Sequence, residues 1–170
     1  MTTPIRRALA ASSRLHALTK DGLQPLKRTD RALIAEEIRD SFTDSLDVDE
    51  AFRPTNPEEN RWDYLLGHDE SREIVALEPH SAHNSQVGTV IRKREASRRH
   101  LRDHLKPGVV VAAWFWVASG KVDFTPMDKA ITQLTENGIA FVGKQVLRKW
   151  LPAATQAGAP TNRGRRNRRR

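Results

Sequence analysis

Apolar residues recur every three or four positions in the first part of the chain, and this spacing predicts a helix over residues 31–42. The residues that share its apolar face are Leu33, Ile34, Ile38 and Phe42. Thr29 and Asp30 stand just before it, and both side chains commonly cap helix N-termini. Further along, Pro54 and Pro57 predict a loop.

Apolar and polar residues begin to alternate near residue 61, which predicts strands. The segment RWDYLLGHDE, residues 61–70, indicates a first strand, and Ile74–Leu77 indicates a second that ends at Glu78 and Pro79. The short connection between them predicts an antiparallel hairpin. Because proline has no N–H to donate, ladder pairing on that side is expected to stop where Glu78 emerges.

The remainder of the pattern predicts alternating helices and strands. A helix from Gln86 to Lys106 follows the capping residue Ser85. Val109–Ala118 is apolar on both faces, as is typical of a central strand covered by helices on two sides. The other elements expected in chain order are a turn at Ser119-Gly120, a short strand at 122–124, a helix from Thr125-Pro126 to Asn137-Gly138, and a last strand at 139–142.

The predicted order is therefore α-β-β-α-β-β-α-β, an α/β fold with a mixed β-sheet flanked by helices. A single domain is expected over residues 29–151, since a chain of 170 residues is of ordinary size for one domain. Residues 1–28 are expected to form a basic N-terminal arm or a peripheral helix. The first 20 residues also resemble an organelle-targeting segment, because they contain basic residues and no acid. Residues 152–170 are expected to be a disordered arginine-rich tail.

Composition excludes several classes of site. The chain has no cysteine, which rules out disulfides, thiolate metal ligands and cysteine nucleophiles, and favours a cytoplasmic location. Its longest apolar run, VVVAAWFWVA, is the length of a strand and well short of the roughly 20 residues that a membrane-spanning helix needs. No membrane partner is therefore expected.

The net charge of +8 is concentrated at the C-terminus. Six of the 29 basic residues follow position 162, and the remaining 23 nearly balance the 21 acidic ones. Such a tail, with Arg165 and Arg166 as representative contacts, would neutralise phosphates without sequence preference. Nucleic acid is therefore the expected partner, and a homodimer or a protein partner is also compatible with the sequence.

Asp63 and Glu78 are candidate metal ligands because they lie on neighbouring strands of the predicted hairpin. A hard cation such as Mg²⁺ or Mn²⁺ takes oxygen ligands, usually one or two carboxylates completed by waters and substrate phosphate. The alternative is that each acid is solvated or ion-paired at a strand end. In the following helix, Arg94 and Arg98 project on its apolar side at 100° per residue, so they either extend to solvent or meet anions as phosphate contacts.

This order of elements and acids resembles the PD-(D/E)xK nuclease superfamily. There a helix precedes a hairpin whose strands carry an Asp and then a Glu-x-Lys, followed by a helix and another strand. The resemblance covers residues 30–117 and implies a restriction-endonuclease-like core, a divalent metal and phosphodiester hydrolysis. Asp63 would match the first acid and Glu78 the second, and Glu36 or Glu37 would match an acid that some members carry on the first helix.

His80 departs from that pattern, because it stands where the superfamily has lysine. In the superfamily the lysine orients the attacking water and stabilises the charged transition state. Two substitutes follow from the resemblance: His80 itself, as a base or metal ligand, or a cation from the next helix, with Lys93 first and Arg94 second. If neither acts, the domain would be a catalytically inactive nucleic-acid- or protein-binding module with the same fold.

Two further interpretations remain open. His80 and His83, three residues apart with a carboxylate nearby, are a candidate Zn²⁺ site. A ββα-metal nuclease site would use one of them with Asn84 and a helix histidine, His100 or His104, although the doubly buried strand does not belong to that architecture. The chain also resembles a family of small uncharacterised bacterial proteins in its RWDY, LGH, Glu-Pro-His-x-Ala and WVASGKV segments, which implies no function.

Overall fold

A six-stranded mixed sheet forms the centre of the molecule in a computed structural model that describes residues 2–125 and 128–155. The strands lie side by side in chain order; the first four pair antiparallel, and the last two join in parallel. This confirms the predicted α/β class with a mixed sheet. The strands are β1 (Lys20–Asp21), β2 (Phe42–Asp47), β3 (Tyr64–His68), β4 (Glu73–Ala82), β5 (Ala113–Val122) and β6 (Ile139–Phe141).

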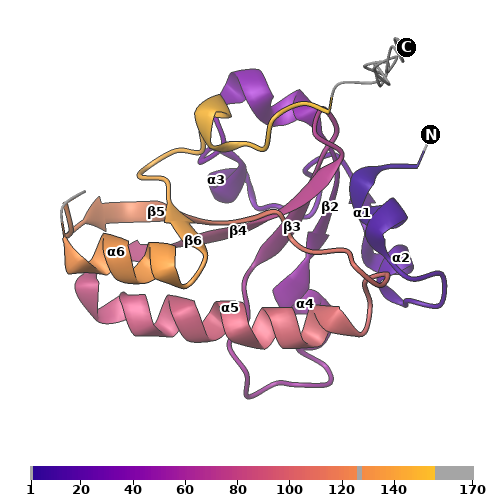
Figure 1. Ribbon diagram of the computed structural model, residues 1–170, viewed down its shortest axis with the longest axis horizontal. Coiled ribbons are helices and arrows are strands. Elements are labelled where there is room, and N and C mark those ends of the chain that lie inside the picture. Colours follow the sequence, from indigo (N-terminus) through magenta and orange to yellow (C-terminus); the bar gives the residue numbers. More distant parts are fainter. Residues whose placement is uncertain (1, 126–127, 156–170) are drawn as a thin grey trace, which may run out of the picture.

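Helices cover both faces of the sheet (Figure 1). The long crossover helix α5 (Val87–Arg102) connects the parallel strands β4 and β5, and it shares its face with α4 (Val48–Phe52) and α6 (Lys129–Glu136). The 3-10 helices η1 (Glu36–Ser41) and η3 (Arg148–Trp150) contribute to the core on the other face. The other short helices are α1 (Pro4–Ala8), α2 (Leu15–Leu18), α3 (Arg28–Arg31) and η2 (Asn84–Gln86).

Alternation along the strands creates two apolar cores, one on each face. Leu65 and Trp116 belong to the core under α5, whereas Tyr64 and Phe115 belong to the opposite one. β5 is therefore buried on both sides over most of its first half, as its continuous apolar run predicted.

The helix predicted over residues 31–42 is wrong. α3 ends at Arg31, where the predicted helix should begin, η1 follows from Glu36, and Phe42 opens strand β2 opposite His68 of β3. Ile34 and Ile38 are completely buried, so their spacing did indicate a packed side, but Ile34 lies in an isolated bridge to Val146 and Ile38 in the 3-10 helix η1. Strand β2 is thus an additional antiparallel neighbour that the apolar pattern did not indicate.

The turn predicted at Ser119-Gly120 is also wrong. β5 runs on to Val122, which pairs with Ala82 of β4, because the long parallel partner continues to offer a ladder. The next helix begins at Lys129, and Pro126 and Met127 of its predicted start lie outside the described residues. Helix α5 ends at Arg102, before the predicted Lys106. Within the described residues, no helix is both long and apolar enough to span a membrane.

The N-terminal segment, expected as a basic arm or a peripheral helix, packs against the sheet through α1 and α2 (Figure 1). Ile5, Leu9 and Leu15 are fully buried in the core under α5. The buried Asp44 of β2 caps α1: its carboxylate accepts hydrogen bonds from Thr3 Oγ1 at 2.6 Å and from two backbone N–H groups, those of Ile5 at 3.2 Å and Arg6 at 3.1 Å.

Replacing Asp44 with Ala should lower the free energy of unfolding by about 2–3 kcal/mol, because buried donors lose a charged acceptor. Urea denaturation of the full chain measures this loss. Asp40→Ala removes an exposed acid nearby and should change the unfolding free energy by less than about 0.5 kcal/mol. Equal stability of the two variants would contradict the capping role of Asp44.

Candidate functional site

Asp63, Glu78 and Lys93 meet on the face of the sheet that α5 covers. The Lys93 ammonium group forms an ion pair with Glu78 Oε1 and lies 3.7 Å from Asp63 Oδ1. The backbone N–H of Asp63 donates to Glu78 Oε2 at 2.9 Å. One carboxylate from just before β3, one from β4 and one ammonium group from α5 thus form a single cluster.

The strand register explains why the two acids meet. Tyr64 stands opposite Leu77 in the β3–β4 ladder, so Asp63 and Glu78 are the next residues outward on each strand. The second turn of α5 then brings Lys93 over this point. A hydrogen bond of 2.7 Å from the Trp62 backbone N–H to Ser97 Oγ holds the start of β3 against the same helix.

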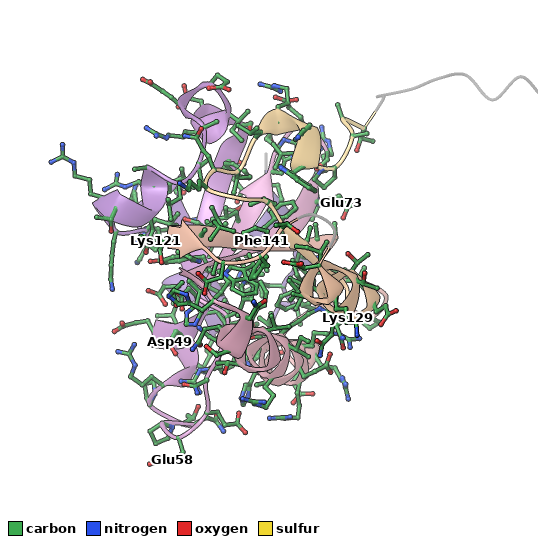
Figure 2. The ribbon with its side chains drawn as sticks, turned by 90° about the vertical axis from the view of Figure 1, so that its left-hand side faces the viewer. Asp49, Glu58, Glu73, Lys121, Lys129 and Phe141 are labelled. Atoms are coloured by element: carbon green, nitrogen blue, oxygen red, sulfur yellow. The ribbon has the colours of Figure 1, made fainter. Side chains whose placement is uncertain are left out.

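Ion pairs to α4 and to α5 hold the loop 53–63, which leads into β3. Arg61 is almost fully buried, and its guanidinium donates to Asn56 O at 2.5 Å and lies 3.4 Å from Asp49 Oδ1. Farther out, Glu59 pairs with Arg99 of α5 at 2.9 Å. Figure 2 shows Glu58 at the outer end of this loop, extending away from the body of the molecule. These contacts fix the position at which Asp63 enters the sheet.

Burial dominates the electrostatics of the cluster. Glu78 is completely buried, which raises its pKa to about 8; the charge of Asp63 adds to the rise, and Lys93 opposes it. The pKa of Asp63 is also raised, first by burial, although 34% of its side chain is exposed. Additional positive charge at this point would favour the ionised form of both acids.

His80 borders the cluster. Its Nδ1 lies 3.7 Å from Glu78 Oε1, and its Nε2 forms a hydrogen bond of 2.9 Å with Gln86 Oε1 of η2. Because an amide oxygen can only accept, Nε2 is the donor in that hydrogen bond. The sequence did not mark Gln86, because a glutamine six residues after a strand histidine follows no known ligand or catalytic spacing.

The two predicted phosphate contacts lie elsewhere on α5. The Arg94 guanidinium carbon sits 5.3 Å from the ring centroid of Trp114, and burial lowers its pKa. Both Arg94 and Arg98 pair with Glu95, at 2.9 and 3.6 Å, and neither forms an ion pair with the two acids of the cluster. They line a groove of about 250 Å³ together with Arg102. Arg165 and Arg166 lie outside the described residues, as does most of the predicted disordered tail.

The donor set of the cluster fits Mg²⁺ or Mn²⁺ better than Zn²⁺. In residues 2–125 and 128–155, no three His, Asp or Glu side chains are grouped so that they could hold a metal ion. Asp63 and Glu78 offer two carboxylates, a number that Mg²⁺ commonly takes from a protein while keeping several waters. One oxygen of each acid already contacts a cation, the ammonium group of Lys93.

The residues of the other interpretations have separate partners. His83 Nδ1 contacts Asp123 Oδ2 at 2.6 Å on the surface, and His100 contacts Glu59. His104 Nδ1 forms a hydrogen bond of 2.9 Å with Ser13 Oγ. Glu36 and Glu37, the candidate acids of the first helix, are exposed on η1, whose buried residue Ile38 packs into the core on the face opposite α5.

Comparison of the chain with protein-family models, with curated proteins and with solved structures finds no match in any of the three. The class of protein therefore rests on the fold and on the Asp63–Glu78–Lys93 cluster alone.

Proposed function

We propose that this protein is a metal-dependent nuclease-like enzyme that hydrolyses phosphodiester bonds of nucleic acid on a PD-(D/E)xK-like, restriction-endonuclease-like core. One observation carries the proposal: the Lys93 ammonium group meets both Asp63 and Glu78. Lys93 would thus supply, from α5, the positive charge that the superfamily takes from a lysine at the position of His80. The succession of the β3–β4 hairpin, the crossover helix α5 and the parallel strand β5 agrees with the order implied by the resemblance.

Asp63 and Glu78 would hold Mg²⁺ or Mn²⁺. When bound, such an ion polarises a phosphoryl oxygen and lowers the pKa of a water ligand. The raised pKa values of both acids support this assignment, because each carboxylate gains from added positive charge. Lys93 would orient the attacking water and stabilise negative charge on the phosphate. His80 Nδ1 would be a nearby proton acceptor.

A second candidate function is a catalytically inactive nucleic-acid-binding module with the same fold. It is favoured by the complete burial of Glu78 and by the protein partners that both of its oxygens already have. In this case the cluster would only stabilise the fold. Phosphate contacts would come from Arg94 and Arg98 along the α5 groove and from the arginine-rich tail.

The test is cleavage of nucleic acid by the full chain. Double-stranded DNA, single-stranded DNA and RNA are incubated with Mg²⁺, Mn²⁺ or EDTA, and products are resolved on denaturing gels. We expect cleavage with either ion and none with EDTA. Binding that weakens steeply with salt but no cleavage in any condition would favour the module, and the absence of both would contradict both functions.

A further inference from the structure

A second polar hollow, of about 580 Å³, lies beside α3 and η1. It shares no residue with the carboxylate cluster, and Phe42 in its lining pairs with His68, at the end of β3 opposite Asp63. Its lining includes three arginines, one acid and two large apolar side chains: Arg28, Arg31, Arg39, Asp40, Leu23 and Phe42.

The arginines of this hollow differ from Arg94 and Arg98 of the α5 groove in having no ion-pair partner among the described residues. Within the described part of the chain, Arg28, Arg31 and Arg39 form no ion pair, whereas Arg94 and Arg98 both pair with an acid. Asp40 is the only acid among the lining residues, so positive charge is in excess. Like charges gathered around one hollow repel each other, and a bound anion would relieve that repulsion.

Arg39 is also oriented before any ligand arrives. It is half-buried, and its Nε donates to the backbone carbonyl of Ile34 at 2.9 Å. This bond fixes the plane of the guanidinium group and leaves its two terminal nitrogens available. A planar guanidinium with free terminal nitrogens matches the oxygens of a phosphate group and can bind two of them at once.

We propose that this hollow is a phosphate-binding site. Its volume is within the usual range for small-ligand pockets, and Leu23 and Phe42 provide an apolar lining beside the charges, which suits a phosphate carried on an organic group. The phosphate belongs either to a small phosphate monoester or to the backbone of a nucleic acid. The site uses neither Asp63 nor Glu78, so it stands independently of the proposed nuclease activity.

The test is calorimetric titration of the full chain in EDTA, without any cleavage readout. The ligands are inorganic phosphate, a nucleoside monophosphate, and a short oligonucleotide without terminal phosphates. The triple variant Arg28→Gln/Arg31→Gln/Arg39→Gln should weaken binding by at least about tenfold, because charged hydrogen bonds are lost. The control Arg92→Gln/Lys121→Gln/Lys129→Gln removes the same charge at exposed positions elsewhere and should keep binding of inorganic phosphate and of the monophosphate within about threefold, since exposed distant charges are screened.

A second variant, Ala32→Glu, keeps all three arginines and places an acid at an exposed position of the lining. It should weaken binding as the triple variant does, with an unchanged denaturation midpoint. Tighter binding of the monophosphate than of the oligonucleotide assigns the site to a small phosphate monoester, and the reverse assigns it to a nucleic-acid backbone. The proposal is overturned if wild-type protein binds none of the three ligands at millimolar concentration, or if both variants bind them as wild type does.

Discussion

Asp63→Asn and Glu78→Gln should each reduce metal-dependent cleavage by at least about 100-fold, because each keeps the shape of the side chain and removes a charge that holds the cation. Initial rates on a fluorescent oligonucleotide at several Mg²⁺ concentrations measure this effect. Glu73→Gln is the matched control, since this exposed acid (Figure 2) is the first residue of β4, the strand that also carries Glu78. It should cleave at the wild-type rate.

Lys93 and His80 can be separated in the same assay. If Lys93 takes the role of the lysine, Lys93→Met should lose about as much activity as the acid variants, and His80→Ala should lose less. The opposite order would assign that role to His80. Wild-type cleavage by Glu78→Gln would exclude Glu78 as a metal ligand. Circular dichroism of every variant confirms that the fold is retained.

Lys93→Met should also lower the free energy of unfolding, by about 3 kcal/mol at alkaline pH, because it leaves the buried Glu78 without its cation. The penalty should shrink toward pH 5, where the carboxyl group is protonated and neutral. Urea denaturation at pH 5, 7 and 9 measures the difference. A penalty that is equal at pH 5 and pH 9 would contradict the ion pair as its source.

The same group predicts a pH dependence for the wild-type protein. The pKa of Glu78 rises from 4.5 to about 8 on folding, so the folded chain holds more protons than the unfolded chain between these values. Stability contributed by this group is therefore present below about pH 4.5 and is lost as the pH rises toward 8. Glu78→Gln should remove this decline, and the double variant Glu78→Gln/Lys93→Met should recover most of the stability that Lys93→Met alone loses, since no buried charge remains unpaired.

The hairpin and the helix after it could be predicted from the sequence because their signals are local. Strand alternation and the short connection predicted that Asp63 and Glu78 are neighbours, and the resemblance brought Lys93 forward as a candidate. Strand β2 could not be found in this way. Its buried Asp44 and Ser45 form hydrogen bonds with Thr3 and Gly22, which lie far away in the sequence. The local sequence pattern around β2 does not reveal such partners.

The same limit explains the arginines of α5. Projection on a helical wheel placed Arg94 on the apolar side, where its side chain is indeed mostly covered. The wheel does not show what covers each side of a helix. In the folded chain, Trp114 of β5 lies under Arg94, whereas Lys93, one residue earlier, faces β3 and β4. Lys93 and Arg94, which are neighbours on one turn of α5, therefore contact different strands of the sheet.

The spacing of the carboxylate cluster along the chain has a kinetic consequence. Asp63 and Glu78 are 15 residues apart, and Glu78 and Lys93 are another 15 apart. Closing such short loops costs little entropy, and contacts of low sequence separation generally form early in folding. The β3–β4–α5 segment is thus expected to assemble first and to offer its free strand edges to β2 and β5. The N-terminal helix α1, anchored through Asp44, would dock last.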